Sequence, residues 1–168
     1  MKDSMLHDLH EYLRSHHFGK YRGTVIDTDP ATMRVKASVP SVLGDTGSSW
    51  ATACVPYAGP QVGFFMLPEI GSGVWIEFEA GDVSFPVWTG CYWNDGEIPS
   101  SAAATLKTII TTAGTLSFDN SAASVTLQDS AQHTVVINSS GITATGGSGV
   151  VAAGASGVSI NNGALEVM

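Results

Sequence analysis

The last 61 residues of the chain, positions 108–168, carry a repeating pattern of short apolar segments. Val, Leu or Ile recurs every 7 to 10 positions, and Gly, Ser, Asn or Asp stands between most of these residues. This spacing is typical of short strands joined by tight turns in a solenoid. The segment has no Lys or Arg, and its only acidic residues are Asp119, Asp129 and Glu166. The pattern therefore predicts a stack of short, nearly uncharged strands.

One copy of this segment has too little apolar surface to fold alone. Its apolar residues are few and mostly small, whereas every ordered residue costs conformational entropy. Three copies wrapped around one axis would bury these residues and pair strand edges that a single copy leaves open. We therefore predict an obligate homotrimer whose tail is an intertwined trimeric β-helix or β-prism. The residues predicted to form the trimer core are Leu116, Val125, Val135, Ile142, Val150 and Val158.

A flexible tail rich in Gly, Ser and Ala is the alternative interpretation of this composition. Alternating triplets such as Val125-Thr126-Leu127 and Val158-Ser159-Ile160 argue against it. Apolar residues two apart lie on the same side of a strand, so these triplets favour ordered strands with one buried face.

The composition of the whole chain narrows its possible partners. Its 168 residues suffice for one compact domain and an extension. Only 13% are charged, against about 25% in ordinary soluble domains, so surface is hidden in an assembly or covered by Ser, Thr and Asn. A net charge of −8 and only seven dispersed Lys and Arg disfavour nucleic acid as a partner. Cys54 and Cys91 lack a metal-binding spacing and are expected to be buried strand residues rather than a disulfide, in a protein made in the reducing cytoplasm.

Residues 1–19 predict a short amphipathic helix. Its apolar stripe would consist of Met5, Leu6, Leu9, Tyr12 and Leu13. Asp3 or Ser4 would cap the helix and Gly19 would end it. The segment has no long apolar run, so we expect neither a signal peptide nor a membrane span. His7 and His10 are one helical turn apart, but no Cys or carboxylate completes a site, and we predict no metal and no cofactor.

Residues 20–93 alternate between apolar and polar residues in short runs separated by turn residues. The runs cover 20–28, 33–39, a short stretch near 51–56, 73–79 and 86–93, with residues 41–50 as a loop. Strands of this number and length favour a small closed barrel, and the OB fold is the nearest architecture. We predict that Ile76 and Phe78 point inward, and that Trp75 lies outside, against a neighbouring chain or another protein of the assembly.

The barrel segment also resembles a known family. Residues 66–82, MLPEIGSGVWIEFEAGD, and 85–92, FPVWTGCY, are similar to the signature of the central spike proteins of contractile injection machines. That family includes phage baseplate assembly protein V, the phage tail-associated spike and the type VI secretion spike. The upstream strands at 23–27 and 33–37, and the order of barrel and repeat tail, match as well, so the resemblance covers nearly the whole chain.

The resemblance implies a structural protein, a homotrimeric spike at the tip of a contractile phage tail-like machine. Such a spike seats on a baseplate hub protein and pierces the target cell envelope when the sheath contracts. It would be assembled into a phage tail or an extracellular phage tail-like particle. The tail has no His-X-His motif, so we expect a blunt end without metal. A separate PAAR-type tip protein would then bind at Leu165, Val167 and Met168.

The predicted organisation is a helix at 1–19, an OB-fold barrel at 20–93, a linker at 94–107 and a trimeric shaft at 108–168. The linker is too short for the peptidoglycan-cleaving domain that some relatives carry at this position. No nucleophile elbow, HExxH or P-loop motif is present, and Asp27 with Asp29, like Glu77 with Glu79, are expected on the solvent face of strands. We therefore predict that the protein is not an enzyme.

The alternative function is an OB-fold module that binds a glycan or a nucleic acid single strand, with the tail as a trimerising stalk. The aromatic residues that would supply a stacking platform are Trp75, Trp88, Tyr92 and Trp93. Aromatic residues at strand positions more often belong to a barrel core or an interface, and the acidic net charge also disfavours this alternative.

Overall fold

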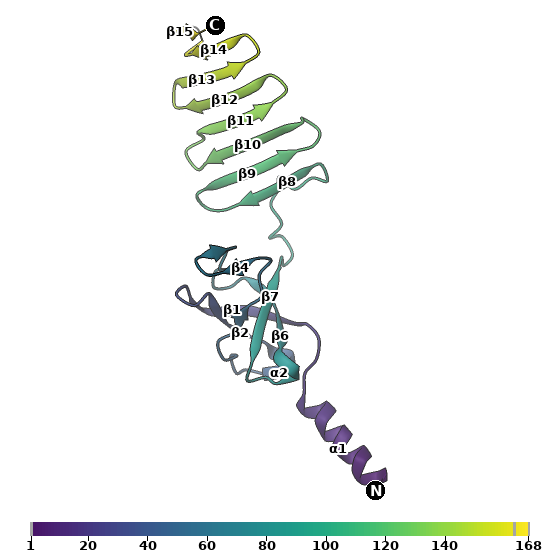
Figure 1. Ribbon diagram of the computed structural model, residues 1–168. Helices are drawn as coiled ribbons and strands as arrows, with labels where there is room; N and C mark the ends of the chain where they lie inside the picture. Colours follow the sequence, from purple (N-terminus) through teal and green to yellow (C-terminus); the bar gives the residue numbers. More distant parts are fainter. Residues whose placement is uncertain (1, 163, 168) are drawn as a thin grey trace. The chain divides into compact units, whose positions relative to one another are not determined.

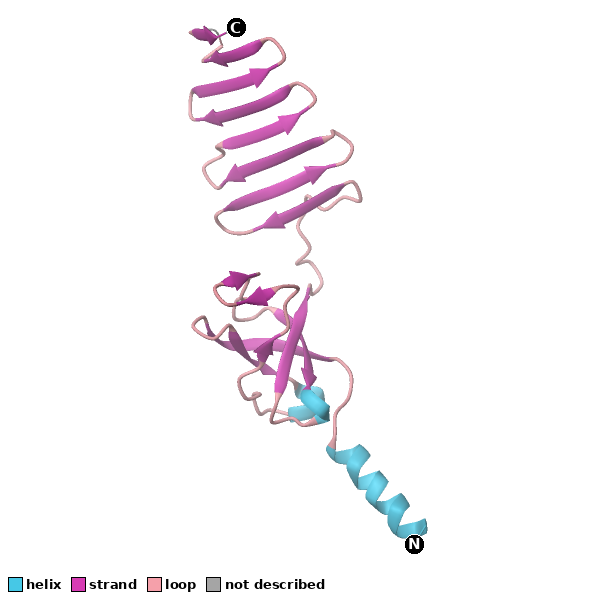
Figure 2. Ribbon diagram, in the orientation of Figure 1, coloured by secondary structure: helices cyan, strands magenta, loops and turns pink. Residues whose placement is uncertain are grey.

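The computed structural model describes residues 2–162 and 164–167, which form two compact units, Met1–Ile98 and Pro99–Met168. The side chains of residues 2–4, 166 and 167 lie outside the described part, and so do Asp3 and Ser4 as predicted helix caps. Strands predominate in both units, and the helices belong to the N-terminal unit (Figures 1 and 2). The predicted all-β class with a short N-terminal helix is confirmed.

The first element is helix α1 (Lys2–Ser15), which carries the predicted apolar stripe. All five side chains of the stripe are exposed. The helix ends at Ser15, four residues before Gly19, the predicted end. In the described residues, no helix combines the length and the apolar character that crossing a membrane requires.

The segment after the helix contacts both the helix and the barrel through its two histidines. The His16 ring stacks on Tyr12 with 3.9 Å between ring centroids. The backbone amide of His17 donates to the carbonyl oxygen of Gly81 at 2.8 Å, and its ring lies edge-on to Phe78. His16 therefore packs against the helix, and His17 packs against the barrel.

A five-stranded sheet with the order β2-β1-β6-β7-β3 forms the barrel. Its strands are β1 (Tyr21–Asp29), β2 (Arg34–Ser38), β3 (Thr52–Ala53), β6 (Gly73–Phe78) and β7 (Pro86–Tyr92). Ala51, which precedes β3, exchanges backbone hydrogen bonds of 2.7 and 3.3 Å with Val35 of β2. This exchange joins the two ends of the strand order, so the sheet closes on itself as an OB barrel does.

The barrel unit contains three short elements besides its main strands. Residues 41–50 were expected to be a loop, but they begin with helix α2 (Pro40–Leu43), in which proline suits the first turn. A separate hairpin is formed by β4 (Ala58–Gly59) and β5 (Val62–Gly63). The turn between β6 and β7 contains the 3₁₀ segment η1 (Glu79–Gly81), in which Gly81 has the positive φ of 84° that a tight turn favours.

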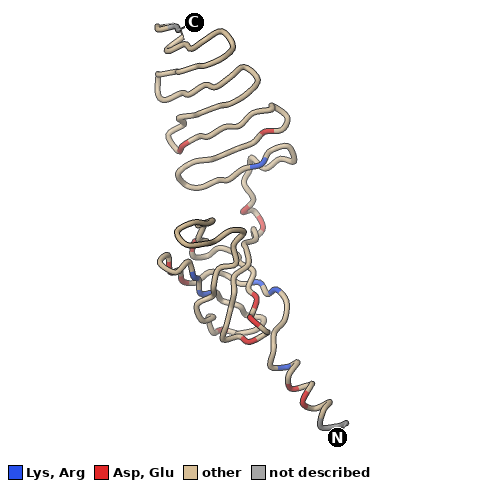
Figure 3. The backbone as a smooth tube through the Cα atoms, in the orientation of Figure 1, with Lys and Arg blue, Asp and Glu red and all other residues tan. Residues whose placement is uncertain are grey.

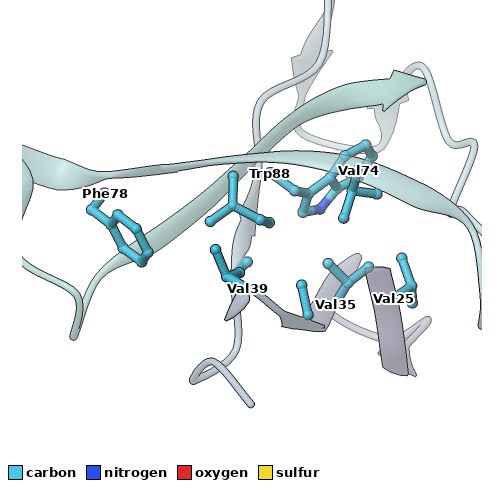
Figure 4. Packing of buried hydrophobic residues seen from close by; sticks show 9 residues of the cluster. Val25, Val35, Val39, Val74, Phe78 and Trp88 are labelled. Atoms are coloured by element: carbon cyan, nitrogen blue, oxygen red, sulfur yellow. The ribbon is translucent and has the colours of Figure 1, made fainter. Parts of the chain in front are cut away.

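The barrel core consists of nine buried hydrophobic residues from β1, β2, β6, β7 and the segments beside them (Figure 4). Ile76 and Phe78 are 0% and 6% exposed, which confirms their predicted inward orientation. Gly73 is also buried. A Cβ atom at this position would lie only 2.7 Å from the Tyr92 ring, so only glycine fits here. Trp75 lies half-buried, outside the core. Cys54 and Cys91 are free thiols as expected, but both are exposed, so the prediction that they are buried is wrong.

The core predicts the effect of one truncation. Ile76→Ala should lower the free energy of unfolding of the barrel by about 2–5 kcal/mol, because it leaves a cavity among fully packed side chains. Ile70→Ala is the matched control, since Ile70 is 66% exposed and should change stability by less than about 0.5 kcal/mol. Urea unfolding followed by tryptophan fluorescence measures both, and equal losses in the two variants would contradict this core.

The C-terminal unit is one antiparallel sheet in which strands pair in chain order (Figure 1). Its eight strands are β8 (Leu106–Ile110), β9 (Gly114–Asp119), β10 (Ser124–Asp129), β11 (Thr134–Asn138), β12 (Gly141–Gly146), β13 (Gly149–Gly154), β14 (Gly157–Ile160) and β15 (Leu165–Val167). We expected other copies to pair the open strand edges, but β9 to β14 are paired on both edges within one chain. Of the two predicted tail forms, this pairing fits one wall of a β-prism.

Short turns with fixed side-chain chemistry connect the strands of the tail. Asp119, Asp129 and Asn138 each end a strand, and each side chain accepts the backbone amide two residues later at 2.8–2.9 Å. Gly141 begins β12 with a φ of 128°, and a Cβ atom there would lie 2.0 Å from the carbonyl oxygen of Ala153. The polar residues and glycines between the apolar segments are therefore the turn residues of a meander.

Candidate functional site

The register of the tail sheet separates its side chains onto an apolar and a polar face. Residues directly opposite in an antiparallel pair share a face, so each chain of pairs traces one row across the sheet. The first apolar row contains Ile109, Leu116, Leu127, Val135, Ala144, Val151, Ile160 and Leu165. The second apolar row, on the same face, begins with Lys107 and continues with Phe118, Val125, Ile137, Ile142, Ala153 and Val158.

The opposite face of the sheet is rich in hydroxyl groups. Its central row contains Thr108, Ser117, Thr126, Val136, Thr143, Ala152 and Ser159. Ser and Thr remain well solvated at the surface of a strand and also suit its backbone geometry. The two faces thus differ in chemistry along the whole sheet, and the polar face is the one suited to water.

The apolar face is uncovered in a single chain. Among the described residues of the tail, none is buried, and Leu127, Ile142 and Val151 are 56%, 48% and 45% exposed. In the described chain, every buried hydrophobic residue belongs instead to the barrel unit. An apolar surface that extends over eight strands is unfavourable in water and marks a protein–protein contact.

Five of the six predicted core residues lie together on this apolar face. Leu116 and Val135 belong to the first row, and Val125, Ile142 and Val158 belong to the second. Val150 lies on the polar face, opposite Thr145, and its neighbour Val151 takes the position on the apolar face.

The predicted core residues include only one residue per strand and omit the second apolar residue that most strands place on this face. Leu127, Ile137 and Ile160 are each two positions after an apolar residue of the same strand, and this alternation was the available signal. It could not resolve Val150 from Val151, because the two are adjacent and only the register of β13 against β12 separates them.

The tail sheet carries few charged residues, as the sparse blue and red segments of the tube in Figure 3 show. Lys107 is on the first strand, whereas Asp119 and Asp129 end strands β9 and β10. The Asp129 carboxylate is hydrogen-bonded to the His133 imidazole at 2.8 Å, and this bond is the main cause that lowers the pKa of Asp129. The hydroxyl of Ser121 lowers the pKa of Asp119 in the same way. Both carboxylates therefore hold turns in their ionised form.

The predicted tip-binding residues are only partly described. Leu165 on β15 is 56% exposed. The side chain of Val167 and the whole of Met168 lie outside the described residues. Strand β15 is the last in the sheet order, so in the described part of the chain its outer edge has no partner strand.

The aromatic residues of the barrel do not form one stacking platform. Trp88 is buried in the core. The guanidinium of Arg22 lies 5.0 Å and 4.6 Å from the ring centres of Trp75 and Tyr92. Because Arg22 occupies these two rings, the exposed Trp93 is left as a single aromatic side chain rather than part of a shared surface.

The spaced carboxylates and histidines do not converge on a site. Asp27 lies 3.9 Å from the ammonium of Lys36, and Glu77 lies 2.6 Å from that of Lys20. In the part of the chain that the structure describes, no three His, Cys, Asp or Glu residues are grouped so that they could hold a metal ion. The extended apolar face is therefore the candidate functional site.

Two family models match the chain, one for each unit. Residues 21–93 match the type VI secretion system/phage-baseplate injector OB domain. Residues 105–166 match the phage baseplate V C-terminal trimerisation domain. A comparison with curated proteins finds no match. The second match contains all eight strands but the end of β15, so the uncovered apolar face lies in a segment similar to a trimerisation domain.

The two faces predict opposite effects for neighbouring substitutions. Ile142→Asp should convert the trimer into single chains, because it places three carboxylates in a core that water does not reach. Thr143→Asp, one residue later on β12, should leave the trimer intact because Thr143 lies on the opposite, polar face of the sheet. Sedimentation equilibrium gives the mass of each variant.

A second pair controls for the choice of strand. On β13, Val151→Asp should dissociate the trimer and Val150→Asp should not. If the Val150 variant dissociated as readily as the Val151 variant, the assignment of the apolar face would be wrong.

Proposed function

Because the chain belongs to the family of phage baseplate assembly protein V and the type VI secretion spike, we propose that it is the central spike of a contractile phage tail-like machine. Its role in the baseplate is structural, and its tail is a trimerisation domain. The observation that carries the proposal is the apolar face of the tail sheet, which spans all eight strands and has no cover in one chain.

Three tail sheets with their apolar faces inward would form a closed prism with a dry core. The Ser and Thr residues of the polar face would then cover its outside. Eight strands at about 4.8 Å spacing give a shaft roughly 34 Å long. Strands shorten from six residues in β13 to four in β14 and three in β15, so the prism would narrow toward its end.

The prism supplies stiffness for piercing an envelope. A continuous ladder of backbone hydrogen bonds runs from β8 to β15, and a packed core resists compression. Sheath contraction would provide the work, so the spike would contact the target envelope only transiently. This role requires no catalytic residue, no cofactor and no nucleic acid.

We assign the hub contact to apolar surfaces of the N-terminal unit. The stripe on α1 is exposed, and so are Val62, Phe64 and Phe65 in and beside the β4–β5 hairpin. Exposed apolar groups of this size normally contact another protein. A baseplate hub protein is the partner that the proposed role requires, and the assembled particle is a phage tail or an extracellular phage tail-like device.

A particle that lacks its own copy of this chain provides the functional test. Wild-type protein and Thr143→Asp should restore baseplate assembly and killing of target cells, whereas Ile142→Asp should restore neither. Electron microscopy of particles and a killing assay measure the two outcomes. Full activity of particles with an Ile142→Asp chain confirmed as a single chain would overturn the proposal.

At the end of the shaft, a PAAR-type tip protein would cover the open edge of β15 and the exposed Leu165. Removing residues 165–168 should abolish binding of the tip protein from the same particle, while β8 to β14 keep the trimer. Co-purification measures the binding, and Ser159→Ala on the polar face is the control. Undiminished binding after the deletion would exclude this assignment.

A further inference from the structure

The apolar face has a depression around Ala144 of β12, where the first row is interrupted by a small side chain. Ala144 of β12 is its smallest first-row residue, and Gly146 and Gly149 at the β12–β13 turn add no side chain. The depression has a volume of about 450 Å³ and is also lined by Leu127, Val135 and Val151. His133 and Asp129 lie at one side of it, already hydrogen-bonded to each other. Thr134 and Thr145 complete the lining, which is otherwise apolar.

On β12 the second row carries a large side chain and the first row a small one. Ile142 and Ala144 are two residues apart on β12 and share the apolar face. Ile142 is half exposed, so its side chain stands above the sheet beside the depression. On the next strand the sizes reverse, with Val151 in the first row and Ala153 in the second.

Three-fold symmetry determines which rows meet. If three copies are arranged around an axis parallel to the rows, the first row and then the second row of each copy follow one another around the trimer. Each corner of a closed trimer therefore joins the second row of one copy to the first row of the next, which is a heterologous contact. At the level of β12 this contact brings Ile142 of one copy toward Ala144 of its neighbour.

We propose that the depression at Ala144 receives the Ile142 side chain of the next copy in the trimer. The inference rests on the proposed trimeric spike and adds the partner surface and its register. A shift by one strand would set Ile142 against Val135 or Val151, both larger than Ala144. The packed corner therefore fixes the three chains at the same height along the shaft.

Disulfide formation between copies tests this contact. The variant Ile142→Cys/Ala144→Cys is made in a background in which Cys54 and Cys91 are replaced by Ala. Residues two apart on one strand have parallel side chains, so their Cβ atoms stay about 6.6–6.8 Å apart, whereas a disulfide needs Cβ atoms about 3.5–4.5 Å apart. A disulfide within the chain is therefore excluded. Oxidation should give a covalent trimer on a non-reducing gel.

Two controls use the same strand. Thr143→Cys/Thr145→Cys on the polar face should give no crosslinked trimer, because these residues face solvent. Ile142→Cys alone should give no crosslink, because each copy of Ile142 packs at a different corner of the trimer and no two copies of Ile142 meet. A crosslink through the single cysteine would overturn the proposal.

The outcomes separate this inference from the proposed function. If the reduced double variant sediments as a trimer but oxidation yields only single chains, the corner contact is wrong and the spike proposal stands. If the background protein itself is a single chain, the proposed trimer fails. Should the β12 variant not trimerise when reduced, Val151→Cys/Ala153→Cys on β13 makes the same test with smaller changes in volume, and absence of its covalent trimer overturns the contact.

Discussion

The apolar face of the tail sheet is the constraint on which the rest of the structure depends. The meander satisfies the backbone of its inner strands within one chain, so hydrogen bonding does not force the chain to associate. The side chains do, because two rows of Val, Ile, Leu and Phe remain exposed across the sheet. A second and a third copy remove this surface from water without altering any strand pairing.

The two units solve the problem of burial differently. The barrel closes through the exchange between Val35 and Ala51 and encloses its own nine-residue core. The tail encloses no core in one chain, so its stability cannot be separated from assembly. This division suits the proposed spike, in which the barrel would present its exposed surfaces to a hub protein and the tail would become a stiff shaft only as a trimer.

The sequence predicted the fold class, the family and the inward direction of Ile76 and Phe78, because alternation and turn residues are local signals. It did not predict α2 or the β4–β5 hairpin, which lie in a stretch without clear alternation. It assigned Val150 rather than Val151 to the core, because only the register of β13 against β12 shows which of the two lies on the apolar face. The domain boundaries, the role of the core residues and the binding of a tip protein remain predictions.

The central claim is that two further copies of this chain cover the apolar face. Sedimentation equilibrium of the full chain over a range of concentrations tests it most directly. The account predicts a mass of three times 17.4 kDa that persists on dilution. A mass of 17.4 kDa at micromolar concentration, with the β-sheet signal of the tail intact, would contradict it.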